Sequence, residues 1–246
     1  MEIIKSYLDI NSMSRPATPI GPIKAVVIHW VGNPKSTALA NRNYFNRLKE
    51  QDKIYASSHY IIGLEGEILA CVPENEVAYH SKQANSYSIG IENCHEDWNG
   101  EFNYKTYQSL IALCVDLCKR YNLSPLTDLK RHYDITGKDC PKYYVQNTKA
   151  WEQLKKDVAS HMIEEDKALA DAVSQIILSG VLINFNQWKR IDLIKLKNVP
   201  SLIKKLGGIN DLVDKKIITD VKLWQSQGYS ASHVRSLLIK YAKTLK

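Results

Sequence analysis

The sequence contains no apolar run that approaches the roughly 18 residues a helix needs to cross a membrane. Its first residues, MEIIKSYLDINSMSRPATP, also lack the apolar core of a secretory signal peptide. These two absences predict a chain that is made in the cytoplasm and does not enter a membrane. If its target lies outside the cell, another component has to deliver it.

Cysteine is scarce as well. The chain has five cysteines, an odd and scattered set that does not indicate a disulfide framework. Cys114 and Cys118 fall in the helical pattern LIALCVDLCKRY and are predicted to be small buried hydrophobic side chains. Hydrophobic residues make up 44% and charged residues 24% of the chain, which excludes a disordered protein. The 246 residues leave room for one large domain or two smaller ones.

Positive charge is concentrated in the last hundred residues. Residues 1–150 contain 17 Lys and Arg against 16 Asp and Glu, whereas residues 151–246 contain 16 against 10. A basic segment favours an anionic partner, such as nucleic acid, a lipid surface or an acidic wall polymer. Charge alone does not choose among the three.

Strand and helix patterns alternate up to about residue 160. Apolar, β-branched runs predict strands over 24–32 and 88–94 and a hairpin over 57–73. Helical spacing is found over 37–50, with Thr37 as its N-cap, and over 106–123 and 148–162, while 128–144 is a turn-rich loop. We therefore predict an α/β domain over residues 1–160, with a central mixed sheet flanked by helices.

An internal repeat follows a polar, charged segment (161–167) that is predicted to be a hinge. Residues 173–190 match 209–226 at an offset of 36, which aligns Trp188 with Trp224. Residues 199–206 likewise resemble 234–242. We predict a small all-α domain of two helical repeats over 167–246, in which both tryptophans pack in the core. Two copies of one unit would also suit the binding of a polymer.

Three side chains are candidate metal ligands. His29 lies near the end of a predicted strand, and His132 and Cys140 lie eight residues apart in the turn-rich loop. A catalytic zinc is held by three protein ligands and keeps one position open for water. Two imidazoles and a thiolate would meet that need, although a histidine after a strand is more often structural, so spacing alone leaves both readings open.

Five segments in a fixed order extend this pattern. They are VVIHW (26–30), SSHYIIGLEGEI (57–68), AYHS (78–81), SIGIEN (88–93) and RHYDITGKDCP (131–141). Over about residues 20–155 the chain resembles the N-acetylmuramoyl-L-alanine amidases, a family of zinc enzymes that includes phage and Bacillus-type endolysins and the peptidoglycan recognition proteins. The resemblance places the zinc ligands on His29, His132 and Cys140. Non-catalytic recognition proteins typically lack the cysteine ligand, so Cys140 favours an enzyme.

The resemblance also implies two catalytic residues. Glu92 corresponds to a carboxylate near the metal-bound water, and Lys138 corresponds to a basic residue in the same pocket. One branch of the family has a tyrosine before the hairpin histidine, where this chain has Ser58 before His59. We therefore expect Glu92 to handle the proton. The structural alternatives are a surface ion pair for Glu92 and a solvated loop position for Lys138.

The remaining candidates lie outside this core set. Tyr79 and His80 match a family position that lines the groove and are predicted to bind substrate. His59 is predicted to be a satisfied internal group. Asp134 either orients a zinc ligand or forms a turn. Three further histidines without a motif are predicted to lie on the surface, namely His95, His161 and His233.

The sequence thus predicts a Zn²⁺-dependent enzyme that hydrolyses the amide between N-acetylmuramic acid and L-alanine in peptidoglycan. The C-terminal repeats are expected to bind the cell wall, through an anionic secondary polymer, with self-association as an alternative. Lys outnumbers Arg there and no Arg-rich recognition helix is present, which argues against nucleic acid. We expect a phage endolysin that stays in the host cytoplasm until its release for cell lysis, or a prophage-derived or autolytic relative. The alternative function is a peptidoglycan recognition protein that binds without cutting.

Overall fold

Two compact units make up the chain, Met1–His161 and Met162–Lys246. The computed structural model describes residues 1–51, 53–191 and 194–245. Within these ranges no helix combines the length and the apolar character needed to cross a membrane.

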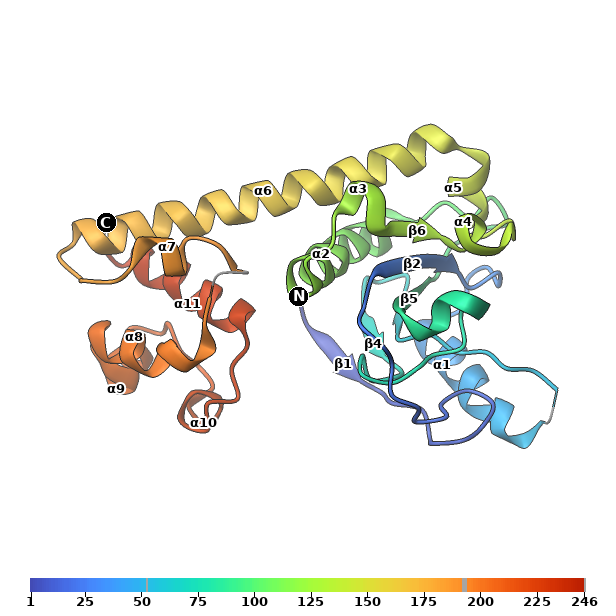
Figure 1. Ribbon diagram of the computed structural model, residues 1–246, viewed down its shortest axis with the longest axis horizontal. Coiled ribbons are helices and arrows are strands. Elements are labelled where there is room, and N and C mark those ends of the chain that lie inside the picture. Colours follow the sequence, from blue (N-terminus) through green and yellow to red (C-terminus); the bar gives the residue numbers. More distant parts are fainter. Residues whose placement is uncertain (52, 192–193, 246) are drawn as a thin grey trace. The chain divides into compact units, whose positions relative to one another are not determined.

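A six-stranded mixed sheet forms the centre of the first unit (Figure 1). Its strands lie in the order β1-β4-β3-β5-β2-β6. Its strands are β1 (Ile3–Lys5), β2 (Ala25–Trp30), β3 (Tyr60–Ile62), β4 (Ile68–Ala70), β5 (Ser88–Asn93) and β6 (Leu129–Arg131). β3 and β4 pair antiparallel, and the other pairs are parallel. The predicted mixed sheet, the hairpin over 57–73 and the strands over 24–32 and 88–94 are confirmed.

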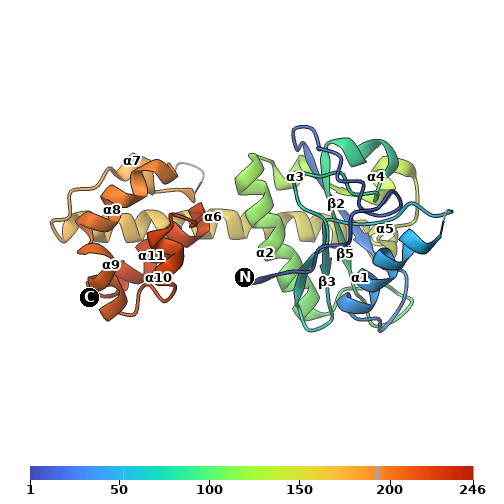
Figure 2. The ribbon, with the colours of Figure 1, turned by 90° about the horizontal axis from the view of Figure 1, so that it is seen from below.

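Helices cover both faces of this sheet, as Figure 2 shows for α1 and α2. The helices are α1 (Ala38–Arg47), α2 (Tyr104–Tyr121), α3 (Pro125–Asp128), α4 (His132–Thr136), α5 (Lys142–Gln146) and α6 (Thr148–Leu178), with short 3-10 turns η1 (Leu48–Glu50) and η2 (Lys82–Ser86). Thr37 accepts a hydrogen bond from the Ala40 N–H and so caps α1, as predicted. Because β2 is covered on both sides, its Val26, Val27 and Ile28 are fully buried, which explains the continuous apolar run.

A half-buried carboxylate links the hairpin to α2. Glu74, just after β4, accepts hydrogen bonds from Arg120 at 2.5 and 2.7 Å, from Tyr121 at 2.6 Å, and from the Tyr60 hydroxyl. Burial alone would raise the pKa of Glu74, but these donors and the Arg120 charge lower it to about 2. The ionised carboxylate is therefore held more tightly in the folded chain than in the unfolded chain.

Glu74→Gln is expected to lower the free energy of unfolding at pH 7 by about 1–2 kcal/mol, because the partly exposed Arg120 loses its charged partner. The folded pKa lies below the unfolded value of about 4.3, so the wild-type advantage is present above that value and is lost as pH falls toward 2. Urea unfolding at several pH values measures it. Glu65→Gln breaks only an exposed ion pair with Lys105 and should change little. A loss of stability in Glu74→Gln that does not vary with pH would contradict the lowered pKa of Glu74.

Two stretches differ in local structure from what their residues indicated. The polar segment 161–167, which was predicted to be a hinge, is helical, because α6 continues through it to Leu178. Its Met, Glu and Lys residues are good helix formers, so its polarity indicated a solvated helix face. The turn-rich loop 128–144 contains β6, α4 and α5, and β1 was also missed. These elements are three to five residues long, too short to show a hydrophobic period.

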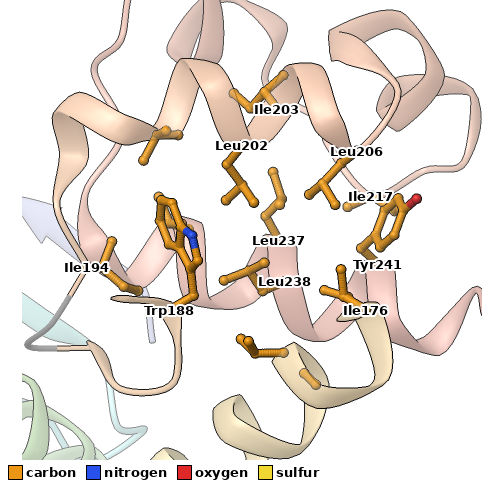
Figure 3. Close-up of a cluster of buried hydrophobic side chains, with 14 of the residues drawn as sticks. Ile176, Trp188, Ile194, Leu202, Ile203, Leu206, Ile217, Leu237, Leu238 and Tyr241 are labelled. Carbon is orange, nitrogen blue, oxygen red and sulfur yellow. The ribbon is translucent and has the colours of Figure 1, made fainter. Parts of the chain in front are cut away.

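The second unit is all helical in the residues that the structure describes. Besides the end of α6 it contains α7 (Phe185–Trp188), η4 (Leu196–Asn198), α8 (Val199–Lys205), α9 (Gly208–Asp214), α10 (Val221–Gln225) and α11 (Ala231–Lys243). Figure 3 shows its core, in which Trp188 lies among aliphatic side chains such as Leu202 and Leu237. Trp188 and Trp224 are only 4% and 7% exposed, so the predicted packing of both tryptophans is confirmed.

Candidate functional site

Three parallel strands end at one edge of the sheet and bring the candidate residues there. β2 lies between β5 and β6, and His29 on β2 is in register with Glu92 on β5. Ile28 is in register with Arg131 at the end of β6, and His132 follows as the first residue of α4. Since neighbouring parallel strands end at the same edge, three residues far apart in the sequence meet there.

Cys140 joins them through the loop after α4. The helix ends at Gly137, whose φ of 77° is a left-handed conformation that glycine adopts without strain. The Tyr133 N–H then donates to the Cys140 carbonyl oxygen at 3.0 Å, which closes the loop. As a result, one ligand atom from each of His29, His132 and Cys140 lies within 4.8 Å of the other two.

The distances between these donor atoms suit a tetrahedral metal. His29 Nδ1 lies 3.1 Å from His132 Nδ1 and 3.8 Å from Cys140 Sγ. A zinc ion bonded at about 2.0–2.3 Å holds its ligand atoms roughly 3.3–3.6 Å apart. Two imidazoles and one thiol are also a donor set that zinc accepts. The residues present therefore fit a zinc ion.

Burial sets the protonation of the three groups. It lowers the pKa of His29 well below its usual range, and together with the nearby Lys138 charge it lowers the pKa of His132 to about 4. Burial, reinforced by Glu92, raises the pKa of Cys140 to about 12. The imidazoles are thus in the neutral form that binds metal, whereas Cys140 has to release a proton when a metal binds.

Glu92 provides a carboxylate beside this cluster. Its Oε2 atom is buried and has no hydrogen-bond partner among the residues that the structure describes. Burial raises the pKa of Glu92 to about 8, against the opposing charge of Lys138. A carboxyl group that titrates near neutral pH can both accept a proton and return it. The alternative prediction, a surface ion pair at Glu92, does not agree with this buried oxygen.

A cavity of about 640 Å³ opens over the cluster. All seven predicted site residues line it: His29, Tyr79, His80, Glu92, His132, Lys138 and Cys140. The sequence did not point to other lining residues, among them Trp30, Phe45, Tyr55, Lys82 and Asn85. Trp30 could have been found, because it follows His29 directly and belongs to VVIHW, one of the five segments that carry the resemblance. The others come from segments without a motif and reach the cavity only through the fold.

One histidine was predicted wrongly. His95 was expected on the surface, but it is fully buried and stacks on Trp30 with ring centroids 4.6 Å apart. Its Nδ1 lies 2.7 Å from the Asp97 carbonyl oxygen. His95 follows the end of β5 and turns inward there, which sequence polarity does not reveal. His161 and His233 are exposed, as predicted.

Two other predicted residues have partners away from the ligands. His59 is buried, its Nε2 lies 3.0 Å from the Glu76 carbonyl oxygen, and its Nδ1 accepts from the Gly90 N–H at 3.0 Å. It is therefore a satisfied internal group, as predicted. Asp134 accepts hydrogen bonds from the backbone N–H and the guanidinium of Arg131, the residue before α4, and so caps the start of this helix. Of its two predicted roles, the local one is observed.

Fold and site together define a class of protein: an α/β domain with a candidate metal centre and an adjacent carboxylate, as metal-dependent hydrolases have. Comparison with known proteins narrows this class. The family described as N-acetylmuramoyl-L-alanine amidase matches residues 19–143, about half of the chain. The chain belongs to the N-acetylmuramoyl-L-alanine amidase family.

Several relatives carry amidase or endolysin names. A probable N-acetylmuramoyl-L-alanine amidase of Bacillus licheniformis is 34% identical over 172 residues, covering 65% of this chain and 48% of that protein. N-acetylmuramoyl-L-alanine amidase BlyA of Bacillus subtilis is 32% identical over 177 residues, covering 64% and 47%. An endolysin of Enterobacteria phage T3 is 28% identical over 132 residues, covering 51% and 84%. The chain spans about half the length of the Bacillus relatives.

Solved structures share the fold of the first unit. A mutant endolysin from Bacillus subtilis has a TM-score of 0.53 at 24% identity, over 64% of this chain and 98% of that chain. PlyL has a TM-score of 0.55 at 21% identity, over 64% and 97%. At these identities the likeness supports the fold and leaves the chemistry to be argued from the site.

Proposed function

We propose that the chain hydrolyses the amide bond between N-acetylmuramic acid and L-alanine in bacterial peptidoglycan, with Zn²⁺ bound by His29, His132 and Cys140. One observation carries the proposal: the three donor groups and the unpartnered oxygen of Glu92 belong to residues that line one cavity. Family membership and the amidase names of the relatives support the choice of bond. The phage T3 relative supports a role as an endolysin in cell lysis.

Glu92 is the proton acceptor in this proposal. A zinc ion at the three ligands supplies Lewis-acid chemistry, which polarises an amide carbonyl and makes water more acidic. Glu92 takes the proton of the attacking water and passes it to the leaving amine of L-alanine, which contributes about 100- to 10,000-fold in rate. Ser58 donates its hydroxyl to the Tyr60 carbonyl oxygen at 2.8 Å, and so it is not assigned a proton-transfer role.

Lys138 stabilises negative charge in the same reaction. It is exposed at the cavity, where its charge acts on Glu92, His29 and His132. An ammonium group there can stabilise the oxyanion that forms on the scissile carbonyl, a role worth about 3–4 kcal/mol for a well-placed donor. We assign Tyr79, which also lines the cavity, to substrate contact.

Digestion of purified Gram-positive peptidoglycan, with and without a chelator, tests the proposal. We expect free peptide stems that begin in L-alanine, an intact glycan, and loss of product when metal is removed, all measured by mass spectrometry. Cleavage of glycan or of bonds inside the peptide would contradict the assigned bond. Binding to the wall without any release would support a non-catalytic recognition protein instead.

We propose that residues 167–246 form two helical repeats that bind the cell wall through an anionic secondary polymer. The basic excess of this part of the chain supports the proposal. Sedimentation of the full chain with walls, before and after extraction of their anionic polymers, measures it. Undiminished binding to extracted walls would contradict the choice of polymer, and sedimentation velocity would detect self-association.

Matching local geometry supports the two repeats. At an offset of 36 residues, the Val181 N–H donates to the Ile176 carbonyl oxygen at 3.3 Å and the Ile217 N–H donates to the Leu212 carbonyl oxygen at 2.9 Å. In both places the preceding residue has a positive φ. The side chains of Asn184 and Asp220, also 36 residues apart, cap the two short helices that carry the tryptophans.

A further inference from the structure

We propose that His80 is a positioning residue that fixes which nitrogen of His29 offers its lone pair to the metal. The proposal rests on the metal centre proposed above. The two rings lie edge to face, with centroids 5.2 Å apart, and His80 Nδ1 is 3.1 Å from His29 Nε2. His29 therefore presents Nδ1 to His132 and Cys140 and Nε2 to His80.

Ser88 determines the tautomer of His80. The Ser88 hydroxyl donates its proton to the Ala84 carbonyl oxygen at 2.6 Å. That hydroxyl oxygen and the Ser88 carbonyl oxygen lie 3.4 and 3.3 Å from His80 Nε2. Both oxygens can only accept a hydrogen bond from the ring. His80 Nε2 therefore carries the proton, and its Nδ1 is left as an acceptor.

The tautomer of His80 in turn determines that of His29. Because His80 Nδ1 is an acceptor, His29 Nε2 has to carry the proton and donate it. A neutral imidazole has one N–H, so His29 Nδ1 keeps its lone pair. That atom is the one 3.1 Å from His132 Nδ1 and 3.8 Å from Cys140 Sγ. A ligand fixed in this way does not have to change tautomer or orientation when the metal binds.

Gly90 on β5 leaves room for the His80 ring. A Cβ atom on Gly90 would lie 2.5 Å from His80 Cγ and 2.8 Å from its Nδ1, so the ring occupies the space that any side chain at this position would need. The backbone N–H groups of His80 and Ser81 both donate to Asn85 Oδ1, at 3.0 and 2.6 Å. Gly90 in SIGIEN therefore leaves the space that the His80 ring occupies.

The hydrogen bonds that run from Ser88 through His80 to His29 form what we call the histidine relay. Nitrogen-15 spectra of the metal-free full chain with labelled histidines test this relay directly. In the wild type we expect His29 as the Nε2–H tautomer alone. His80→Leu removes the acceptor, so the Nδ1–H tautomer of His29 should become populated. His80→Asn places an amide oxygen close to the position of Nδ1 and should restore the Nε2–H tautomer. A purely structural role for His80 would change stability and leave the tautomer of His29 as it is.

Zinc affinity, measured by competition with a chelator, gives a second readout. His80→Leu and Gly90→Ala should each weaken zinc binding by about 10- to 100-fold, the usual effect of losing a group that orients a metal-bound histidine. His80→Asn should bind zinc close to the wild-type level. His161→Leu removes an exposed histidine and serves as the matched control with unchanged affinity.

The outcomes separate the relay from the metal centre. An Nδ1–H tautomer of His29 in the metal-free wild type would overturn the relay, and so would wild-type tautomer and affinity in His80→Leu. A wild-type chain that binds no zinc would contradict the metal centre, while the metal-free spectra would still decide the role of His80. If His80→Leu does not fold, His80→Asn and Gly90→Ala carry the comparison.

Discussion

Cys140→Ser is expected to remove bound zinc and nearly all amidase activity. Serine keeps the size of the side chain, but its hydroxyl does not supply the soft anionic ligand that zinc takes from a cysteine. Lewis-acid stabilisation is worth several kcal/mol, and each 1.4 kcal/mol is about tenfold in rate, so the rate should fall by about 1,000-fold or more. Zinc content by elemental analysis and release of stems with L-alanine termini measure the two effects.

Cys71→Ser is the matched control for this variant. Cys71 is also fully buried, but its Sγ points to the Leu69 carbonyl oxygen at 3.8 Å and the residue does not line the cavity. This variant should keep both zinc and rate. Chelation should inactivate the wild type and added zinc should restore it, whereas Cys140→Ser should not respond. Full activity of the metal-free wild type would contradict the zinc mechanism.

The site was predictable where residues lie at the ends of strands. His29 and Glu92 each sit near the end of an apolar run, so the pattern predicts the two strands, and Glu92 was assigned from the family resemblance. The structure adds the parallel pairing of β2 and β5 that brings the two residues together. Cys140 was predicted from a resemblance of several ordered segments, since its eight-residue separation from His132 fits many loops. The structure adds the reason for that spacing: a five-residue helix ends at Gly137 and turns the chain back to His132.

What the sequence did not reveal depends on contacts between distant segments. His95 looks polar and isolated, yet Trp30 covers it. The 161–167 segment looks like a linker because charge and helix propensity are carried by the same side chains. The partners of His80 were hidden for a related reason. They are a backbone carbonyl and another histidine's ring, and neither leaves a trace in a motif.

Glu92→Gln is expected to lower the rate of peptidoglycan hydrolysis by about 100- to 10,000-fold while zinc stays bound. Glutamine has the same shape, but its amide cannot accept the proton of the attacking water. The three ligand atoms belong to other residues, so elemental analysis should find the wild-type zinc content. Glu96→Gln, a change at an exposed carboxylate shortly after the same strand, should keep the wild-type rate.

Stability separates this loss from simple damage to the fold. Burial raises the pKa of Glu92 to about 8, above its unfolded value of about 4.3, so the ionised carboxylate is disfavoured in the folded metal-free chain. Between those two pKa values the folded state is increasingly penalised as pH rises, and neutral glutamine removes the penalty. At pH 7 the metal-free variant should therefore unfold at a temperature no lower than the wild type, although it is the less active protein. A variant that keeps wild-type activity would remove Glu92 from the reaction, and one that loses zinc along with its activity would instead make Glu92 a support of the metal centre.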